Sequence, residues 1–311
     1  MTRSTPRIGA TLAALAAAGL LAACGSSDKT SSATTAAPSG GATTSGAGGA
    51  AGADAKVAAL VPAALKSKGT LTVASDASYA PMEFIGADGK TVEGWDADMA
   101  KALAGVMGLK AKVVNATFDG IIPGLASHKY DLGMSSFTDT KEREKTVDFV
   151  TYFTAGTSFY VKAQGGPAIN GLADLCGHKV AVEKGTTQQD DSTAQDKKCK
   201  AAGKKGVSVS VFPDQNSANL ALSSGRSDVG MSDSPVAEYQ VKKSNGQFKI
   251  VGQAYGTAPF GIAIPKGSGL DKAVLAGVKA LIANGQYKSS LDKWGIGQGA
   301  ITAPTINGAT S

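Results

Sequence analysis

Apolar and polar positions follow two periods in turn along this chain. Short runs with strand-type patterning are followed by segments with the three-to-four-residue period of an amphipathic helix. Alternation of this kind predicts an α/β fold with mostly parallel sheets. The predicted strands span 70–75, 111–116, 130–134, 158–163, 179–184, 207–212, 227–231, 249–254 and 260–265, and the predicted helices span 96–107, 119–127, 187–202, 215–224, 235–243 and 270–294.

One helix–strand unit occurs twice. LASHKYDLGMSS at 125–136 and LSSGRSDVGMSD at 222–233 share Leu, Asp, Gly, Met and Ser positions at a constant offset. This echo predicts two similar lobes, and in open α/β sheets ligands bind beyond the carboxyl ends of the strands. The polar residues at these ends should therefore form two facing walls, one with Asp76, Ser136, Thr138 and Arg143 and the other with Glu183, Thr186, Thr187 and Asp233.

The stretch MSSFTDTKER at 134–143 has the composition of an anion site. Hydroxyl groups follow a strand, and Asp139 with Glu142 three residues later predicts the start of a helix, with Arg143 in its first turn. Free backbone N–H groups, a helix dipole and a guanidinium would then converge on a small carboxylate. The alternative is a surface arginine beside an ordinary helix cap.

The first 24 residues predict a targeting segment. Arg3 and Arg7 precede an apolar run over 8–23 that is shorter than a membrane span needs. The run ends in LAAC, which resembles a bacterial lipobox and implies cleavage before Cys24 with lipid on its sulfur. An ordinary signal peptide with an incidental cysteine is the alternative. Residues 25–65 begin with a stretch that is nearly all Ser, Thr, Gly and Ala, so we expect a flexible tether there.

Charge and cysteine content narrow the function classes. The formal charge of +6 falls to +4 without Arg3 and Arg7, and no basic cluster interleaves with aromatics, which argues against nucleic-acid binding. If Cys24 carries lipid, Cys176 and Cys199 remain as a pair in an exported chain, which predicts a disulfide, with two free thiols as the alternative. Neither metal-ligand spacing nor a nucleotide-binding motif is present, so we expect no metal and no cofactor.

Five segments in order resemble one protein family. They are DASYAPMEF (76–84), GWDADMAKAL (94–103), the run over 118–144, KVAVEKGTTQ (179–188) and GQYKSSLDKWG (285–295). Together they resemble the polar amino-acid substrate-binding proteins of ABC importers, solute-binding protein family 3. The resemblance implies a two-lobed periplasmic-binding-protein-like fold of type II, with two mixed, mostly parallel sheets and a two-strand hinge.

The same resemblance implies boundaries, a location and partners. Lobe 1 would comprise 66–156 and 261–298, lobe 2 would comprise 157–260, and 299–311 would form a C-terminal tail. The chain would be a monomer that is exported and lipid-anchored to the outer face of the cytoplasmic membrane, at the cell surface or in the periplasm. Its partners would be a free amino acid and the permease subunits of an ABC importer.

The resemblance also implies individual roles. Arg143 would bind the ligand carboxylate with Thr138 and a backbone N–H near Thr187, and Asp233 and the Ser136 carbonyl would accept the α-ammonium. Tyr79 and Phe118 would enclose the carbon chain, and Asp76 would meet ammonium or side-chain polar groups. An acid at Glu183 together with Asp76 favours a cationic or amide side chain such as that of arginine, lysine, ornithine, histidine or glutamine. The ligand-binding set is therefore Asp76, Tyr79, Phe118, Ser136, Thr138, Arg143, Glu183, Thr187 and Asp233.

Two other functions fit the same scaffold. Cyclohexadienyl or prephenate dehydratases resemble this family, and Glu183 would be the candidate general acid of such an enzyme. The pairing of Arg143 with Asp233 argues against it, because prephenate carries no ammonium group. A lytic transglycosylase would need a second catalytic domain. A ligand-binding sensor subunit is the remaining alternative, and the sequence does not separate it from a transport protein.

Overall fold

The structure, a computed structural model, describes residues 52–310. Its α-helices are α1 (Ala55–Leu60), α2 (Ala63–Lys68), α3 (Trp95–Val106), α4 (Phe118–Ala126), α5 (Thr187–Ala201), α6 (Gln215–Ser223), α7 (Ser234–Lys243), α8 (Asp271–Ala283) and α9 (Gln286–Trp294). Its strands are β1 (Thr70–Ser75), β2 (Ser78–Tyr79), β3 (Glu83–Ile85), β4 (Val92–Glu93), β5 (Lys110–Asn115), β6 (Leu132–Gly133), β7 (Val147–Lys162), β8 (Lys179–Glu183), β9 (Ser208–Phe212), β10 (Val229–Asp233) and β11 (Phe248–Pro265). Short 3₁₀ turns lie at η1 (Arg143–Lys145), η2 (Leu172–Leu175) and η3 (Gly297–Gly299).

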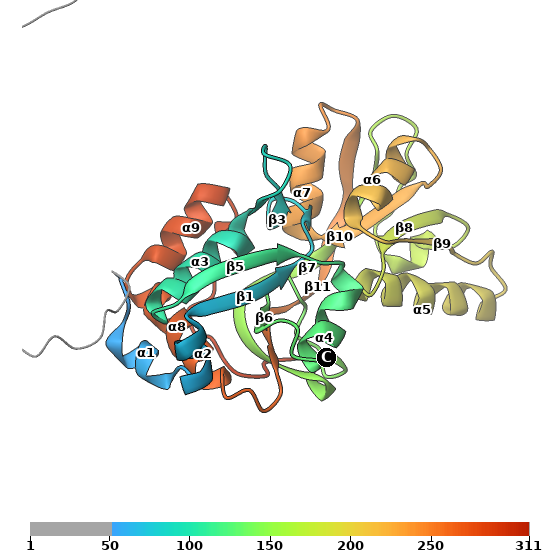
Figure 1. The fold of residues 1–311 in the computed structure, drawn as a ribbon. Helices are drawn as coiled ribbons and strands as arrows, with labels where there is room; N and C mark the ends of the chain where they lie inside the picture. The colour runs from blue at the N-terminus through green and yellow to red at the C-terminus, as the bar shows by residue number, and fades with distance from the viewer. Residues whose placement is uncertain (1–51, 311) are drawn as a thin grey trace, which may run out of the picture. The chain divides into compact units, whose positions relative to one another are not determined.

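The main sheet has a repeated strand order. Its eight strands run β5-β1-β6-β11-β7-β10-β8-β9, and β2, β3 and β4 form a separate antiparallel sheet. The trio β5, β1 and β6 pairs in parallel, as does the trio β9, β8 and β10, with β11 and β7 between them (Figure 1). The first trio with the helices and loops that pack on it is called lobe 1 here, and the second trio with its helices and loops is called lobe 2. The predicted two-lobed α/β fold is confirmed, and the echo in the sequence corresponds to β6 and β10.

The glycines of the echo lie where the backbone has close neighbours. A Cβ at Gly133 would approach the Ile121 side chain to 2.9 Å, and one at Gly230 would approach the Tyr160 ring to 2.5 Å. Each short strand therefore packs directly against a side chain of its own lobe, and a larger residue would displace it.

The two lobes share one ladder of hydrogen bonds, where two separate sheets were expected. The reason is the length of β7 and β11, which have 16 and 18 residues and pair antiparallel from one lobe into the other. Register shifts interrupt this pairing between Val251 and Gly261 of β11. The predicted two-strand connection is therefore part of the sheet itself.

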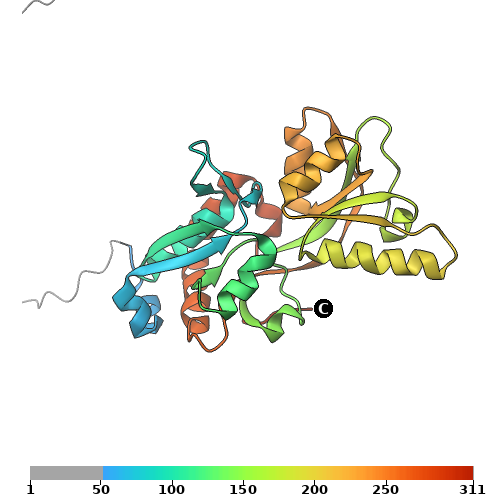
Figure 2. The ribbon, with the colours of Figure 1, turned by 45° about the vertical axis from the view of Figure 1, so that its right-hand side comes forward.

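Each lobe has its own apolar core. The core of lobe 1 includes Trp95, which stacks on Tyr152 with ring centroids 5.2 Å apart, and it extends into α8 and α9. Lobe 2 has a separate core around β7, β8 and β10, and Figures 1 and 2 show α5 and α6 on opposite sides of β8 and β9. Cys176 and Cys199 form the predicted disulfide on this core, with their Cα atoms 5.7 Å apart.

The folded region begins earlier than the expected tether boundary at residue 65. Helices α1 and α2 begin within the expected tether, residues 25–65. Asp54 caps α1 by accepting hydrogen bonds from two backbone N–H groups. Val57 of α1, Val61 between the two helices and Leu65 of α2 are buried in the core of lobe 1. The signal peptide, Cys24 and most of the tether lie outside the described residues. Across 52–310 no helix has both the length and the apolar character needed to cross a bilayer.

The C-terminal region differs from expectation in two ways. The predicted helix over 270–294 is interrupted at Gly285, whose φ of +82° starts α9 in a new direction. The tail over 299–310 is bound to lobe 1, because Ile306 pairs with Val150 along the free edge of β7. Further hydrogen bonds join Thr305 to Thr151 and Asn307 to Phe149, so the tail occupies the side of β7 that β10 leaves unpaired in lobe 1.

The helix predicted to start at Asp139 does not form. Only the single 3₁₀ turn η1 follows, and Asp139 does not cap it. Instead the buried Asp139 carboxylate accepts a hydrogen bond from the Gly308 N–H at 2.7 Å. Burial raises the pKa of Asp139 to about 6. The tail therefore contacts the loop that carries Thr138 and Arg143, and the anion site is built on a loop.

Candidate ligand-binding site

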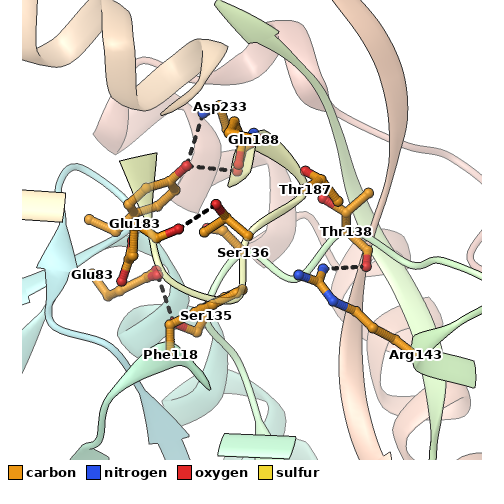
Figure 3. Close-up of a pocket in the computed structure, with 12 residues that line it drawn as sticks. Glu83, Phe118, Ser135, Ser136, Thr138, Arg143, Glu183, Thr187, Gln188 and Asp233 are labelled. Carbon is orange, nitrogen blue, oxygen red and sulfur yellow. Dashed lines mark hydrogen bonds between the residues drawn. The ribbon is translucent and has the colours of Figure 1, made fainter. Parts of the chain in front are cut away.

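Polar ends of strands from both lobes meet at one pocket. Glu183 and Asp233 are the last residues of β8 and β10, and Ser135 and Ser136 follow β6. The pocket is lined by Tyr79, Glu83, Phe118, Ser135, Ser136, Thr138, Arg143, Glu183, Thr186, Thr187, Gln188 and Asp233 (Figure 3). Of the nine predicted ligand-binding residues, eight line it. The carboxyl ends of the strands thus form the site, as the topology predicts.

Arg143 lies at the end of the pocket shared with Thr138 (Figure 3). Its guanidinium donates one hydrogen bond to the Thr138 carbonyl at 2.8 Å and another to the Gly185 carbonyl of lobe 2 at 2.9 Å. It also lies over the rings of Phe118 and Phe137, 5.3 and 5.5 Å from their centroids. Burial lowers the pKa of Arg143 to about 10, so the side chain stays charged at neutral pH. A fixed, charged fork of this kind suits a carboxylate.

The start of α5 adds backbone donors beside Arg143. Thr186 caps this helix, and its hydroxyl accepts a hydrogen bond from the Gln189 N–H at 3.2 Å. Thr187 is the first helical residue, so its N–H has no partner within the helix and remains available to an anion. Thr187 lines the pocket, as the sequence suggested.

Asp233 is a buried acid in the lining of the pocket. Its carboxylate accepts hydrogen bonds from the Tyr79 hydroxyl at 3.0 Å and from the Gln188 amide at 2.9 Å. The Tyr79 hydroxyl in turn accepts a hydrogen bond from the Asp233 N–H at 2.9 Å. One side chain of lobe 1 therefore contacts both the carboxylate and the backbone of Asp233. Burial raises the pKa of Asp233 to about 6. The carboxylate is held in place and is still ionised at neutral pH.

Two glutamates also line the pocket. Glu183 is 2% exposed, and its Oε1 has no hydrogen-bond partner among the described residues. Glu83 is fully buried and accepts the Ser135 hydroxyl at 3.0 Å. Burial and the neighbouring Asp96 raise the pKa of Glu83 well above its ordinary value. The pocket therefore has more acidic groups than basic ones.

Asp96, the neighbour of Glu83, holds the backbone of Ser136 in place. The Ser136 φ of +51° is left-handed, and the Ser136 N–H donates to Asp96 at 2.9 Å. Asp96 also accepts the Tyr152 hydroxyl at 2.6 Å. Asp96 lies in the first turn of α3, and its carboxylate also supports a residue of the pocket.

Asp76 is the one predicted ligand-binding residue that does not line the pocket. Its carboxylate accepts the Phe118 N–H at 2.8 Å and so caps α4, and it lines a neighbouring hollow with Ser78 and Asp214. The residue lies next to the pocket and supports Phe118. The predicted contact between Asp76 and a ligand group remains a prediction.

Sequence reasoning missed three of the lining residues. Ser135 and Gln188 are neighbours of predicted residues, and their position beside strand or helix ends was the available signal. Glu83 had no such signal, because the three-stranded sheet of β2, β3 and β4 that contains it was not predicted. Its partners Ser135 and Asp96 come from distant parts of the sequence, so only the fold brings these groups together.

Polar contacts join the lobes across the pocket. Besides the bonds of Arg143 and Tyr79, Lys184 of lobe 2 forms a 2.8 Å ion pair with Asp119 of lobe 1. The Gln215 N–H of α6 donates to the Ser78 hydroxyl at 3.1 Å. The pocket is thus enclosed by residues from both lobes.

Known proteins share this chain's sequence and fold. The arginine-binding protein ArgT of Corynebacterium glutamicum is 34% identical over 253 residues, which cover 81% of this chain and 83% of that protein. The ABC transporter glutamine-binding protein GlnH of Bacillus subtilis is 34% identical over 65% of this chain and 72% of its own length. A solved ancestral arginine-binding protein bound to arginine has a TM-score of 0.67 and 38% identity, over 73% of this chain and 98% of that structure.

A family model agrees with these relatives. The model of the bacterial extracellular solute-binding proteins, family 3, matches residues 71–298. That range includes every residue of the pocket and ends before the tail that covers β7. On this match and these relatives, the chain belongs to the bacterial extracellular solute-binding proteins, family 3.

Proposed function

We propose that this protein captures a free amino acid with a cationic side chain, arginine foremost, and delivers it to the permease subunits of an ABC importer. One observation carries the choice of ligand. Beside Arg143 and Asp233, which suit the two charges of an amino acid, the pocket has a third buried acid, Glu183, with an unpartnered oxygen.

An amino acid loses its water when it enters this pocket. An amino acid taken out of water must have both charges paired, because an unpaired buried charge is costly. Arg143 and the N-terminus of α5 supply donors for the carboxylate, and Asp233 supplies an acceptor for the α-ammonium. A guanidinium would then satisfy the free oxygen of Glu183, whereas an acidic side chain would face like charge. The arginine-binding relatives support the same choice.

Capture would proceed by closure of the two lobes. We place lobe 1 at 66–156 and 261–298 and lobe 2 at 157–260, with bending in β7 and β11 where their pairing changes register. A monomer exported and anchored by lipid on Cys24, outside the cytoplasmic membrane, would keep the captured ligand near its permease. This arrangement suits the extracellular solute-binding family to which the chain belongs.

Binding without catalysis is the proposed role, in keeping with relatives that are transport proteins. Glu183 would otherwise be the acid of a dehydratase. Asp233 argues against that reaction, because a prephenate-like substrate has no ammonium group for this buried carboxylate. A sensor subunit would use the same pocket, so the distinction lies in the membrane partner.

A binding screen tests the ligand. Thermal unfolding with each of the twenty amino acids should show the largest stabilisation with arginine, about 2.7 kcal/mol at a hundred times its Kd. Calorimetry with Arg143→Ala should show arginine affinity reduced about 10²–10³-fold, because the ligand carboxylate loses its charged partner. Arg226→Ala is the matched control, since Arg226 is exposed and outside the pocket. Near-native arginine affinity in Arg143→Ala would contradict the assigned pocket.

A further inference from the structure

Glu183 is buried by the meeting of the two lobes. It ends β8 in lobe 2, and Gly185, two residues later, lies close to Asp119 and Phe118 of lobe 1. The Glu183 carbonyl accepts the Thr186 hydroxyl at 2.7 Å, but Oε1 of its side chain has no partner within 52–310. The backbone is therefore fixed while the carboxyl group is left unsatisfied.

The charged groups that face Glu183 are mainly acidic. Carboxylates act on it from the end of β1, the start of α4, the cap of α6 and the end of β10, namely Asp76, Asp119, Asp214 and Asp233. Glu83 lines the same pocket, and the hydroxyls of Tyr79 and Tyr160 are close enough to sense the charge of Glu183. Burial, with these neighbours, raises the pKa of Glu183 to about 9.

The nearby cations have other partners. The Arg143 guanidinium donates to the carbonyls of Thr138 and Gly185, and Lys184 is exposed and pairs with Asp119. In the closed pocket, Glu183 therefore needs either a proton or a cation supplied by the ligand.

We propose that Glu183 couples lobe closure to proton uptake: closure on an amino acid with a neutral side chain takes up one proton, and closure on one with a cationic side chain takes up none. This inference rests on the proposed function, because it assumes amino-acid capture by closure. Glu183 is then a specificity residue whose discrimination against neutral ligands depends on pH.

The sign follows from linkage. An open cleft would expose the carboxyl group to water, where its pKa would be the ordinary 4.5, whereas burial between the lobes raises the pKa to about 9. Between these values, closure around a neutral side chain binds a proton, so affinity for that ligand falls as pH rises, by about tenfold per unit. A guanidinium beside Glu183 keeps the carboxylate ionised in both states, so affinity for arginine is free of this slope.

Other titrating groups affect both kinds of ligand alike. Asp233, with its pKa near 6, meets the α-ammonium that every amino acid carries. Burial and the neighbouring Asp96, which are the same for both ligands, raise the pKa of Glu83 well above its ordinary value. A comparison of two ligands that differ only in side-chain charge therefore isolates Glu183.

Arginine and citrulline form such a pair, since citrulline has a neutral ureido group of nearly the same shape. Isothermal titration calorimetry from pH 5.5 to 8.5, in buffers of low and high ionisation enthalpy, measures affinity and proton uptake together. At pH 7 we expect uptake of about one proton with citrulline and none with arginine beyond the shared contribution of Asp233. The ratio of the two Kd values should grow about tenfold per pH unit.

Glu183→Gln should remove the difference in slope and strengthen citrulline binding at pH 8, whereas Glu238→Gln, the matched control, should retain the difference, because Glu238 is exposed and lies outside the pocket. Equal slopes for the two ligands overturn the inference, as does a difference in slope that survives in Glu183→Gln. Loss of the difference in Glu238→Gln, or no citrulline binding at pH 5.5, also overturns it. Absence of arginine binding at every pH would instead contradict the proposed function.

Discussion

Replacement of Asn307 by alanine tests whether the C-terminal tail is part of the folded unit. The Asn307 amide oxygen accepts the Phe149 N–H at 2.8 Å, and its amide nitrogen donates to Asp148 at 3.1 Å. Its backbone has a φ of +52°, a conformation that asparagine tolerates better than alanine. Asn307→Ala would therefore lose two hydrogen bonds, leave the Phe149 N–H unpaired and add strain.

The magnitude follows from these parts. The lost hydrogen bonds, including the unpaired N–H, account for about 2 kcal/mol. Left-handed alanine adds about 1 kcal/mol. A total of about 3 kcal/mol in the free energy of unfolding corresponds to a fall in Tm of about 6–12 °C for a chain of this size.

Thermal unfolding of the ligand-free protein measures this shift, and urea unfolding gives the free energy itself. Asn307→Gly is the matched control, because glycine loses the same side-chain bonds without the strain and should recover about a third of the loss. A fall in Tm below 2 °C for Asn307→Ala would refute the assigned role of the tail. Equal effects of alanine and glycine would refute the strain contribution.

Two further predictions concern lobe 2. Lys184→Gln removes the exposed ion pair with Asp119 that joins the lobes. In stopped-flow measurements, arginine should dissociate from this variant about twofold faster than from the wild type, and its dissociation rate should depend less on salt. An unchanged dissociation rate at low salt would contradict a role of the ion pair in closure. Replacing Cys176 and Cys199 by serine should lower the free energy of unfolding by about 3 kcal/mol in urea titrations, since the disulfide closes a loop in the unfolded chain, and an unchanged midpoint would contradict this.

Much of the site could be predicted from local patterns. The positions of Arg143 and Asp233 follow from polar residues placed just after apolar strands, since parallel strands bring their carboxyl ends to one edge. The echo around Gly133 and Gly230 gave the two lobes, because each copy forms the same helix–strand unit.

Other features depend on contacts between distant segments. The helix expected at Asp139 is absent because its carboxylate binds the tail, some 170 residues away in sequence. Glu83 accepts a hydrogen bond from Ser135, which lies 52 residues away in the sequence, and no local pattern predicts that contact. The interruption at Gly285 is compatible with the helical periodicity on both sides, so the pattern alone predicted one helix.

The long pairing of β7 with β11 has a consequence for exchanging lobe 2 between related proteins. The chain enters lobe 2 and leaves it through adjacent strands, with Thr157 opposite Tyr255. The two junctions are therefore neighbours in space, and the segment between them could be transplanted from one family member into another as a single cassette. Such a cassette carries Glu183 and Asp233 but leaves Arg143 behind. Chimaeras would thus exchange Glu183 and the N-terminus of α5 together, while Arg143 and the rest of the lobe 1 wall stay the same, a modular route to new ligand preferences.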